Sequence, residues 1–177
     1  MTNLENVFER FFLHRSKLIK DYDDKLISKK EFLIKSYEFF SFRNPKPFLF
    51  VNTYEKGMYN YQYYNIVAKY YRMLAKEEKN KRAYNRFMNI SNKNYDLKDR
   101  MILEILKLKN FKNISAYYIN CDSKGLEGKI FEIVLKDEKE AIFHTKNEKI
   151  LKVLKEKNIF EKNQKNSLID KYINERY

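Results

Sequence analysis

The sequence predicts an α+β protein: a mainly helical body around a long central helix, and a small three-stranded antiparallel meander near the C-terminus. Two observations carry this prediction. As far as Asn110, apolar residues recur every three or four positions, which is the period of amphipathic helices. After Asn110, apolar and polar residues alternate in short runs, which is the period of strands. A chain that forms helices first and one small sheet near its end has an α+β arrangement.

Length and composition indicate one domain over residues 1–177. The chain is 44% apolar and 16% aromatic, which is enough to build a hydrophobic core. Three glycines and two prolines leave little material for linkers. Within the domain we expect a helical part over residues 1–110, a β-meander over 111–146 and C-terminal helices over 147–177.

The first two helices begin at capping signals. Residues 2–5 and 28–31 both have a hydroxyl residue followed three positions later by Glu, which is the capping-box pattern. The first box starts a helix over roughly residues 3–26. The second starts a helix that must end before Pro45, and residues 48–51 then form a short extended connector.

The long central helix is predicted over residues 54–79, capped by Thr53. At 1.5 Å per residue it would be about 39 Å long. Gly57 is a weak point in its first turn. A break is expected at Asn80, or at residues 89–94, where asparagine and serine cluster. Its apolar inner face comprises Tyr64, Val67, Tyr71 and Leu74, flanked by Tyr63, Tyr70 and Ala75.

Three further helices are expected. Asp96 can cap a helix that ends at Asn110, and Asn147 can cap another. Residues 167–170 form a third capping box, which opens a terminal helix.

The three strands are expected over residues 114–121, 129–136 and 140–146. Turn-like segments, residues 122–128 and 137–139, separate them. Connections this short favour an antiparallel meander.

The charge of the chain indicates an anionic partner. The formal net charge is +13 and the isoelectric point about 9.5, which favours nucleic acid, an acidic protein or a membrane surface. Abundant Lys, Asn, Ile, Tyr and Phe also fit AT-rich coding, which would explain part of this charge without any ligand. However, residues 45–110 carry fourteen of the 37 cations and six of the 24 anions. An excess concentrated around the central helix favours a functional role for it.

A cationic face of the central helix is the candidate binding surface. Its polar residues recur at steps of three and four, so they form one ridge. About three or four phosphate contacts are expected from it, while amide side chains bind bases or sugars. Tyrosines nearby could stack on unpaired bases, as in single-stranded RNA recognition, although their helical spacing favours a packing role. The candidate nucleic-acid-binding residues are Gln62, Asn65, Lys69, Arg72, Lys76, Lys79, Arg82 and Arg86.

The sequence offers no convincing catalytic residue, metal site or cofactor motif. His14 falls on the polar face of the first helix, and His144 on the third strand. Cys121 lacks the sequence signature of a nucleophile, and a small buried thiol is the simpler interpretation. One cysteine and two distant histidines exclude the spacing of a zinc site.

One weaker pattern suggests a metal-dependent nuclease. Asp122, Glu127 and Lys129 loosely resemble an arrangement in which two carboxylates hold Mg²⁺ and a lysine polarises the phosphate. That chemistry needs Glu and Lys side by side on a strand. Here Gly125 and Gly128 bracket the glutamate, which favours a hairpin turn instead.

The sequence favours a cytoplasmic location. A single cysteine excludes a disulfide framework and fits a reducing compartment. Glu5 and Glu9 stand where a signal peptide would be basic and then apolar. Apolar runs are too short to span a bilayer, so no membrane partner is expected.

Several strings resemble one family. From Lys56 to Tyr71 the sequence reads KGMYNYQYYNIVAKYY, and further matching pieces are FKNISAYYI, FEIVLKD, AIFHTK and the ending SLIDKYINERY. These resemble an uncharacterised family of small basic, tyrosine-rich bacterial proteins, a domain of unknown function. The resemblance implies a single cytoplasmic domain and assigns no catalytic or binding residue.

Together these observations predict a non-enzymatic module that binds nucleic acid, RNA rather than duplex DNA, or a nucleoprotein complex. The alternative is a protein–protein inhibitor or adaptor, such as an anti-CRISPR protein that occupies a guide-RNA or acidic protein surface. A metal-dependent nuclease is the weaker alternative. The oligomeric state stays open.

Overall fold

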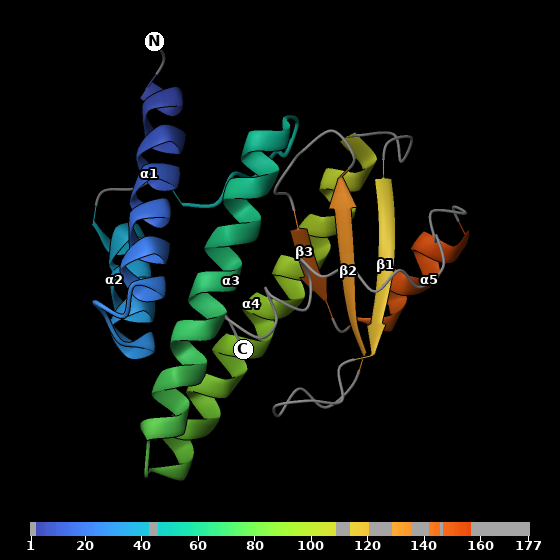
Figure 1. Cartoon of the computed structure of the whole chain (residues 1–177). Coiled ribbons are helices and arrows are strands. Elements are labelled where there is room, and N and C mark those ends of the chain that lie inside the picture. Colours follow the sequence, from blue (N-terminus) through green and yellow to red (C-terminus); the bar gives the residue numbers. More distant parts are fainter. Residues whose placement is uncertain are drawn as a thin grey trace. The chain divides into compact units, whose positions relative to one another are not determined.

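Four helices follow one another in the first part of the chain (Figure 1). The computed structural model describes residues 3–42, 46–108, 114–120, 129–135, 142–145 and 147–156. The chain divides into two units, residues 1–105 and 106–177, and each is described by itself. The helices are α1 (Asn3–Asp23), α2 (Lys29–Ser41), α3 (Tyr54–Glu77) and α4 (Lys81–Leu108).

Helix α1 ends three residues before its predicted end because the chain turns back in a Schellman motif. Lys25 has a φ of 60°, which is the left-handed conformation that this motif requires. The Leu26 amide donates to the Asp21 carbonyl at 2.8 Å, and the Lys25 amide donates to that of Tyr22 at 3.0 Å. Leu26, the last residue of the predicted helix, lies beyond the end of α1 and is exposed.

The predicted caps of α2 and α3 are confirmed. The Ser28 amide donates to Glu31 Oε2 at 2.7 Å, and the Glu31 amide donates to Ser28 Oγ at 3.2 Å. Thr53 Oγ1 accepts from the Lys56 amide at 3.4 Å. Each cap satisfies amides that the first turn of a helix leaves without a partner. Thr2, in the first predicted box, lies outside the described residues.

An aromatic core joins α1, α2, α3 and the connector between α2 and α3. The Phe11 ring lies 5.4 Å from that of Phe40 and 5.5 Å from that of Tyr59. From the connector, Phe48 packs 5.4 Å from Tyr59, whose exposed fraction is 0%. Tilted and edge-on ring pairs at such distances each contribute about 0.5–1.5 kcal/mol beyond area burial.

Helix α3 is buried on two sides, whereas the sequence predicted one apolar inner face. Tyr59 and Ile66 belong to the aromatic core. On another side the Ser91 hydroxyl of α4 donates to the Ala68 carbonyl at 2.9 Å, so the two backbones approach closely. The predicted apolar residues Tyr64, Val67, Tyr71 and Leu74 are buried or half-buried. Helix α3 therefore lies between the aromatic core on one side and α4 on the other.

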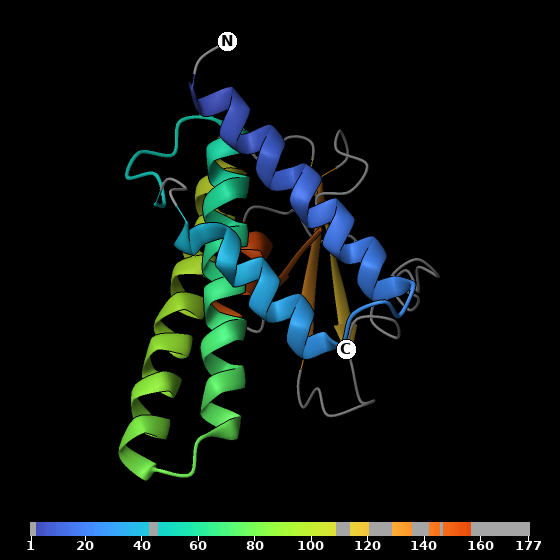
Figure 2. The same ribbon diagram turned by 90° about the vertical axis from the view of Figure 1, so that its left-hand side faces the viewer.

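Helices α3 and α4 form an antiparallel hairpin (Figure 2). The break falls at residues 78–80, the first of the two positions expected from the sequence. Asn80 caps α4, because its Oδ1 accepts from the amides of Arg82 at 2.9 Å and Ala83 at 3.1 Å. The hairpin brings residues from both sides of the break together at its turn.

Helix α4 runs without a break through residues 89–94, so the helix start predicted at Asp96 is wrong. Tertiary packing explains the continuity. Ser91 is buried and satisfied by α3. Asn94 Nδ2 donates to the Ile90 carbonyl one turn earlier, at 2.8 Å. These bonds satisfy polar side chains that would otherwise compete with the helix backbone.

The α+β class predicted from the sequence is wrong, and the fold is mainly helical. The described residues of the first unit lie mostly in the four helices and contain no strand. The described residues of the aromatic core all come from helices and the α2–α3 connector. The strand-like periodicity after residue 110 therefore gave the wrong fold class, because the described core forms between helices.

The second unit contains short elements. Strands β1 (Ile114–Asn120), β2 (Lys129–Leu135) and β3 (Ile142–Thr145) pair antiparallel in the order β1-β2-β3. Helix α5 (Glu148–Glu156) follows. Asn147 Oδ1 accepts from the Lys149 amide at 3.0 Å, so Asn147 is the cap expected there. The terminal helix predicted from Ser167 lies outside the described residues.

Candidate nucleic-acid interface

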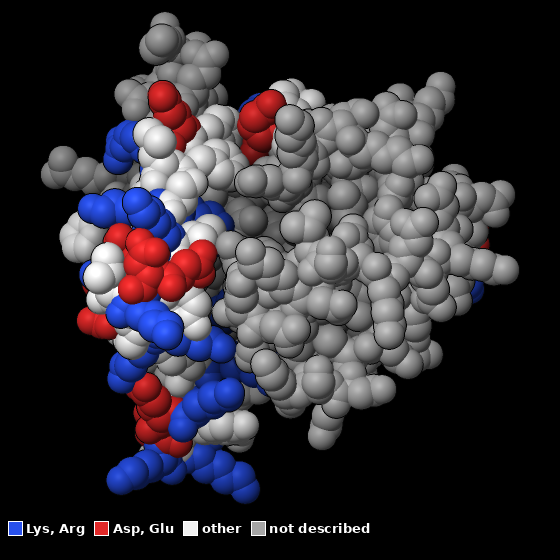
Figure 3. All heavy atoms as spheres, in the orientation of Figure 1, with Lys and Arg blue, Asp and Glu red and all other residues white. Residues whose placement is uncertain are grey.

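Exposed cations gather where the α3–α4 hairpin turns. Helix α3 ends at Glu77 and α4 starts at Lys81, so cations from both helices and from the turn meet. They cover the lower end of the surface seen in Figure 3. We call this cluster the basic tip. Its members, all exposed, are Lys76, Lys79, Lys81, Arg82 and Arg86.

The two acids beside the basic tip are already engaged. Glu77 lies 2.9 Å from the Lys30 ammonium of α2. Glu78 Oε1 accepts from the Asn80 amide at 2.9 Å. In the described part of the chain, none of the basic-tip cations forms an ion pair. The charge of Glu77 is offset by Lys30, and the one remaining carboxylate, Glu78, stands against five cations. The tip therefore keeps an excess of positive charge, and such a surface attracts anions.

The first half of the predicted ridge is less accessible than its second half. Gln62, Asn65 and Lys69 are half-buried, whereas the ridge becomes exposed from Arg72 onward. Gln62 Oε1 is buried, with no hydrogen-bond partner among the described residues. The structure thus brings four predicted residues, Lys76, Lys79, Arg82 and Arg86, into one cluster. It separates them from the predicted amide residues Gln62 and Asn65.

Arg72 and the adjoining part of α4 form a polar contact between the two helices. Burial raises the pKa of the Tyr95 hydroxyl, and the Arg72 and Lys98 cations partly oppose this increase. Lys98 is itself buried, 3.2 Å from Asp99 Oδ1. Its ammonium lies 5.9 Å from the Tyr61 ring centroid and 5.5 Å from that of Tyr95. Lys98 therefore adds nothing to the exposed cationic surface.

Most aromatic side chains of α3 serve packing, and one tyrosine of α4 is available at the basic tip. Tyr59 and Tyr61 are buried, and Tyr70 stacks on Tyr37 with centroids 3.9 Å apart. Tyr84 is 41% exposed. Both Tyr84 and Lys81 are absent from the predicted site, although the run Lys-Arg-Ala-Tyr that opens α4 was a usable signal.

His14 has a structural environment. Its Nε2 lies 3.3 Å from the Lys35 carbonyl oxygen, to which it can donate. Its ring stacks on Phe39, with centroids 5.1 Å apart. Both contacts join α1 to α2, and neither presents the imidazole to a converging set of reactive groups.

The predicted nuclease residues lie mostly outside the part of the chain that the structure describes, and the nuclease stays a prediction. Asp122, Glu127 and Cys121 lie outside the described residues. Lys129 begins β2, and His144 pairs with Glu132 in the sheet register. Over the part of the chain that the structure describes, no cluster of three or more His, Cys, Asp or Glu side chains could hold a metal ion.

Comparison with known families assigns the chain. A family model, described as a family of unknown function (DUF6648), matches residues 1–177. The chain belongs to this family. Membership confirms the predicted resemblance to an uncharacterised domain. Curated proteins and solved structures yield no match, so the site of this DUF6648 protein is argued from its own residues. None of its described helices is both long and apolar enough to cross a bilayer.

Proposed function

We propose that this DUF6648 protein binds single-stranded RNA through the basic tip. One observation carries the proposal: five exposed cations share the hairpin turn, and both neighbouring carboxylates already have partners. Bringing such cations together costs repulsion, which a polyanion relieves. Displacing the counterions of the polyanion supplies the driving force.

The number of cations sets the expected dependence on salt. For a single strand, log K falls with log salt concentration with a slope of about −0.7 per phosphate contact. Contacts from all five basic-tip residues would give a slope of about −3.5. Raising the salt from about 50 to 200 mM would then weaken binding roughly a hundredfold.

Tyr84 favours single-stranded RNA over a duplex. Its partly exposed ring lies in the first turn of α4, three residues after Lys81 and two after Arg82. Only unpaired bases offer a free face to such a ring, and each stacked base contributes about 1–3 kcal/mol. In this hypothesis the cations hold the backbone and the tyrosine holds a base.

Two charge-matched triple variants test the proposal. K79Q/R82Q/R86Q removes three basic-tip cations, and K17Q/K20Q/K29Q removes three exposed cations of α1 and α2. We expect the first variant to bind a labelled RNA of about 15 nucleotides more weakly, with a salt slope less steep by about two. The second should bind like the unmodified chain, as measured by fluorescence anisotropy.

Two outcomes would overturn the proposal. Equal weakening in both triple variants would show that total charge, and not the basic tip, sets the affinity. Absence of RNA binding at low salt would refute the proposed function itself. A third variant, Y84L, should weaken binding by about five- to 150-fold while leaving the salt slope unchanged.

A further inference from the structure

The connector between α2 and α3 presents two adjacent apolar side chains to solvent. Leu49 is 93% exposed and Phe50 is 82% exposed, whereas Phe48, one residue earlier, packs on Tyr59 in the aromatic core. A single exposed apolar residue is ordinary. Two neighbours of this size on one short segment form an apolar patch, which is typical of an interaction surface.

The apolar pair is held in place by a buried asparagine. Asn60 of α3 is buried. Its Nδ2 donates to the Phe48 carbonyl at 2.9 Å, and its Oδ1 accepts from the Phe48 amide at 2.8 Å. Both backbone groups of Phe48 are thus fixed to α3 immediately before the exposed pair. A surface organised in advance loses little conformational entropy when a partner binds.

The same segment offers backbone groups to a partner. In the described part of the chain, no hydrogen bond involves the backbone of Leu49, Phe50 or Val51. Amide and carbonyl groups of three consecutive residues therefore stay available.

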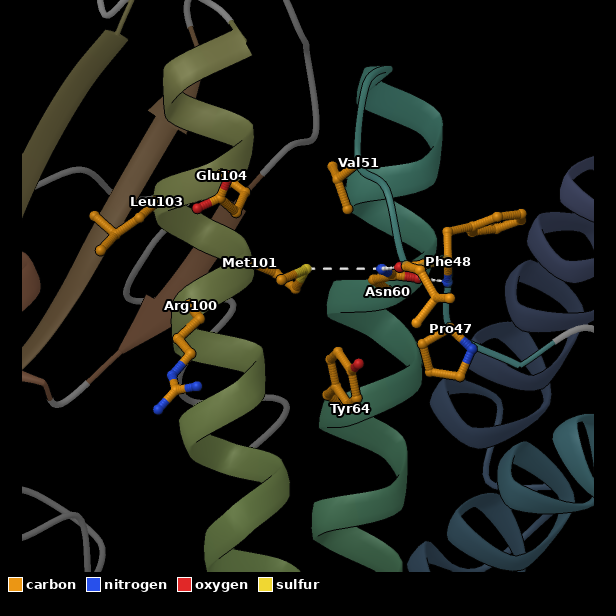
Figure 4. Close-up of a pocket in the computed structure, with 10 residues that line it drawn as sticks. Pro47, Phe48, Val51, Asn60, Tyr64, Arg100, Met101, Leu103 and Glu104 are labelled. Atoms are coloured by element: carbon orange, nitrogen blue, oxygen red, sulfur yellow. Dashed lines mark hydrogen bonds between the residues drawn. The ribbon is translucent and has the colours of Figure 1, made fainter.

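A cleft of about 410 Å³ adjoins the pair. In Figure 4, Met101 points from α4 toward Asn60 on α3, and its Sδ lies 3.7 Å from Asn60 Nδ2. Val51 and Met101 supply apolar lining, while Tyr64, the exposed Arg100 and the half-buried Glu104 supply polar groups. A volume of this size suits one or two inserted side chains.

We propose that an acidic segment of a partner protein docks on this surface, which we call the connector groove. Its apolar side chains cover Leu49 and Phe50 and enter the cleft, its backbone pairs with the free groups of residues 49–51, and its carboxylates face Arg100. Exposed Lys46 and half-buried Lys56 flank the connector. Together with Arg100 they outnumber, by one, the two acids of this surface, Glu55 and Glu104. Charge complementarity thus favours an acidic partner.

Two other occupants fit less well. A bilayer would cover the unpaired backbone groups of residues 49–51 with hydrocarbon, at a cost of several kcal/mol for each group. A second copy of the chain would bring two molecules of net charge +13 together, and such like-charged molecules repel.

The connector groove is separate from the basic tip. Asn60 and Lys76 lie sixteen residues apart on α3, which is about 24 Å along a helix. If the protein fails to bind RNA, this proposal is therefore unaffected. If no peptide binds the connector groove, the RNA-binding proposal is likewise unaffected.

The test uses the full chain and a defined probe. A random-peptide phage library is selected against the protein, with subtraction against L49S/F50S. Because both replaced side chains are exposed, this variant should keep its circular dichroism spectrum and melting temperature. A synthetic peptide of the enriched sequence is then measured by fluorescence anisotropy.

We expect enriched peptides to combine Asp or Glu with Leu, Phe or another large apolar residue. Their affinity should fall at least about tenfold in L49S/F50S and several-fold in R100Q. It should stay unchanged in K79Q/R82Q/R86Q.

Three results would overturn the proposal. The first is a selection with no enriched sequence, or peptides that bind L49S/F50S equally well. The second is retention of the protein, but not of L49S/F50S, on phosphatidylserine–phosphatidylcholine vesicles, which would indicate a membrane surface. The third is a dimer that L49S/F50S converts to a monomer in sedimentation, which would identify a second copy as the occupant.

Discussion

Replacing Gly57 by alanine should destabilise the protein, although Gly57 lies in a helix. In an ordinary helix this change stabilises by about 1 kcal/mol. Here a Cβ at position 57 would lie 2.5 Å from Ile105 Cγ1 of α4 and 3.3 Å from Val51 Cγ1, whereas carbon atoms favour about 3.5–4.0 Å. Ile105 is fully buried and has little room to turn aside. Overpacking costs about 1–3 kcal/mol, which exceeds the helix gain over most of that range, so we expect a net loss of up to about 2 kcal/mol.

Urea unfolding of a double-mutant cycle isolates this contact. I105A alone should cost about 2–5 kcal/mol because it leaves a cavity. It also removes Cγ1 and Cδ1, the two Ile105 atoms nearest the added Cβ. In the I105A background, G57A should therefore be neutral or stabilise by up to about 1 kcal/mol. The reasoning fails if G57A stabilises the unmodified chain, or if its effect is the same in both backgrounds.

Two further predictions concern the polar and aromatic parts of the core. N60A leaves both backbone groups of Phe48 without their partner and should lower the free energy of unfolding by about 2–4 kcal/mol in urea; a loss below about 0.5 kcal/mol would contradict the role given to Asn60. Burial raises the pKa of Tyr59 above its ordinary value of 10.0, so the folded state favours the neutral phenol. The resulting stabilisation is complete below about pH 10 and is lost as the pH rises further. Urea midpoints should therefore fall above about pH 10, less steeply in Y59F, and equal slopes in both proteins would count against this cause.

Helix starts were largely predictable because their signals are local. Ser28 with Glu31, and Thr53, satisfy backbone amides within three residues of themselves. Such bonds depend on the neighbouring sequence and not on distant packing. The end of α1 was less predictable, because it rests on a left-handed Lys25, a conformation that the sequence alone rarely signals for lysine.

Errors arose where distant residues decide the outcome. Gly57 was interpreted as a weak point, yet the missing side chain lets Ile105 approach. Polar Ser91 suggested a break in α4, yet Ala68 of α3 accepts its hydroxyl. In each case the explanatory partner lies more than twenty residues away in the chain.

The candidate site was only partly predictable, because burial by distant residues decides which charges are exposed. Charge and its concentration in residues 45–110 are properties of the sequence. The accessibility of each charge cannot be read from the sequence. Lys69 is half-buried and Lys98 is buried, while Lys81 is exposed. The connector groove was missed altogether, because the sequence does not show that Phe48 is buried while Leu49 and Phe50 are exposed.

The sequence by itself determined the positive charge, the family and the local caps that start α2 and α3, because each depends on composition or on neighbouring residues. Only the tertiary structure decided which cations form the basic tip and which aromatic rings enter the core. The mainly helical class was decided there too, since the described core is built from helices and the connector. Burial depends on contacts between residues far apart in the chain, and periodicity records only which residues share a face.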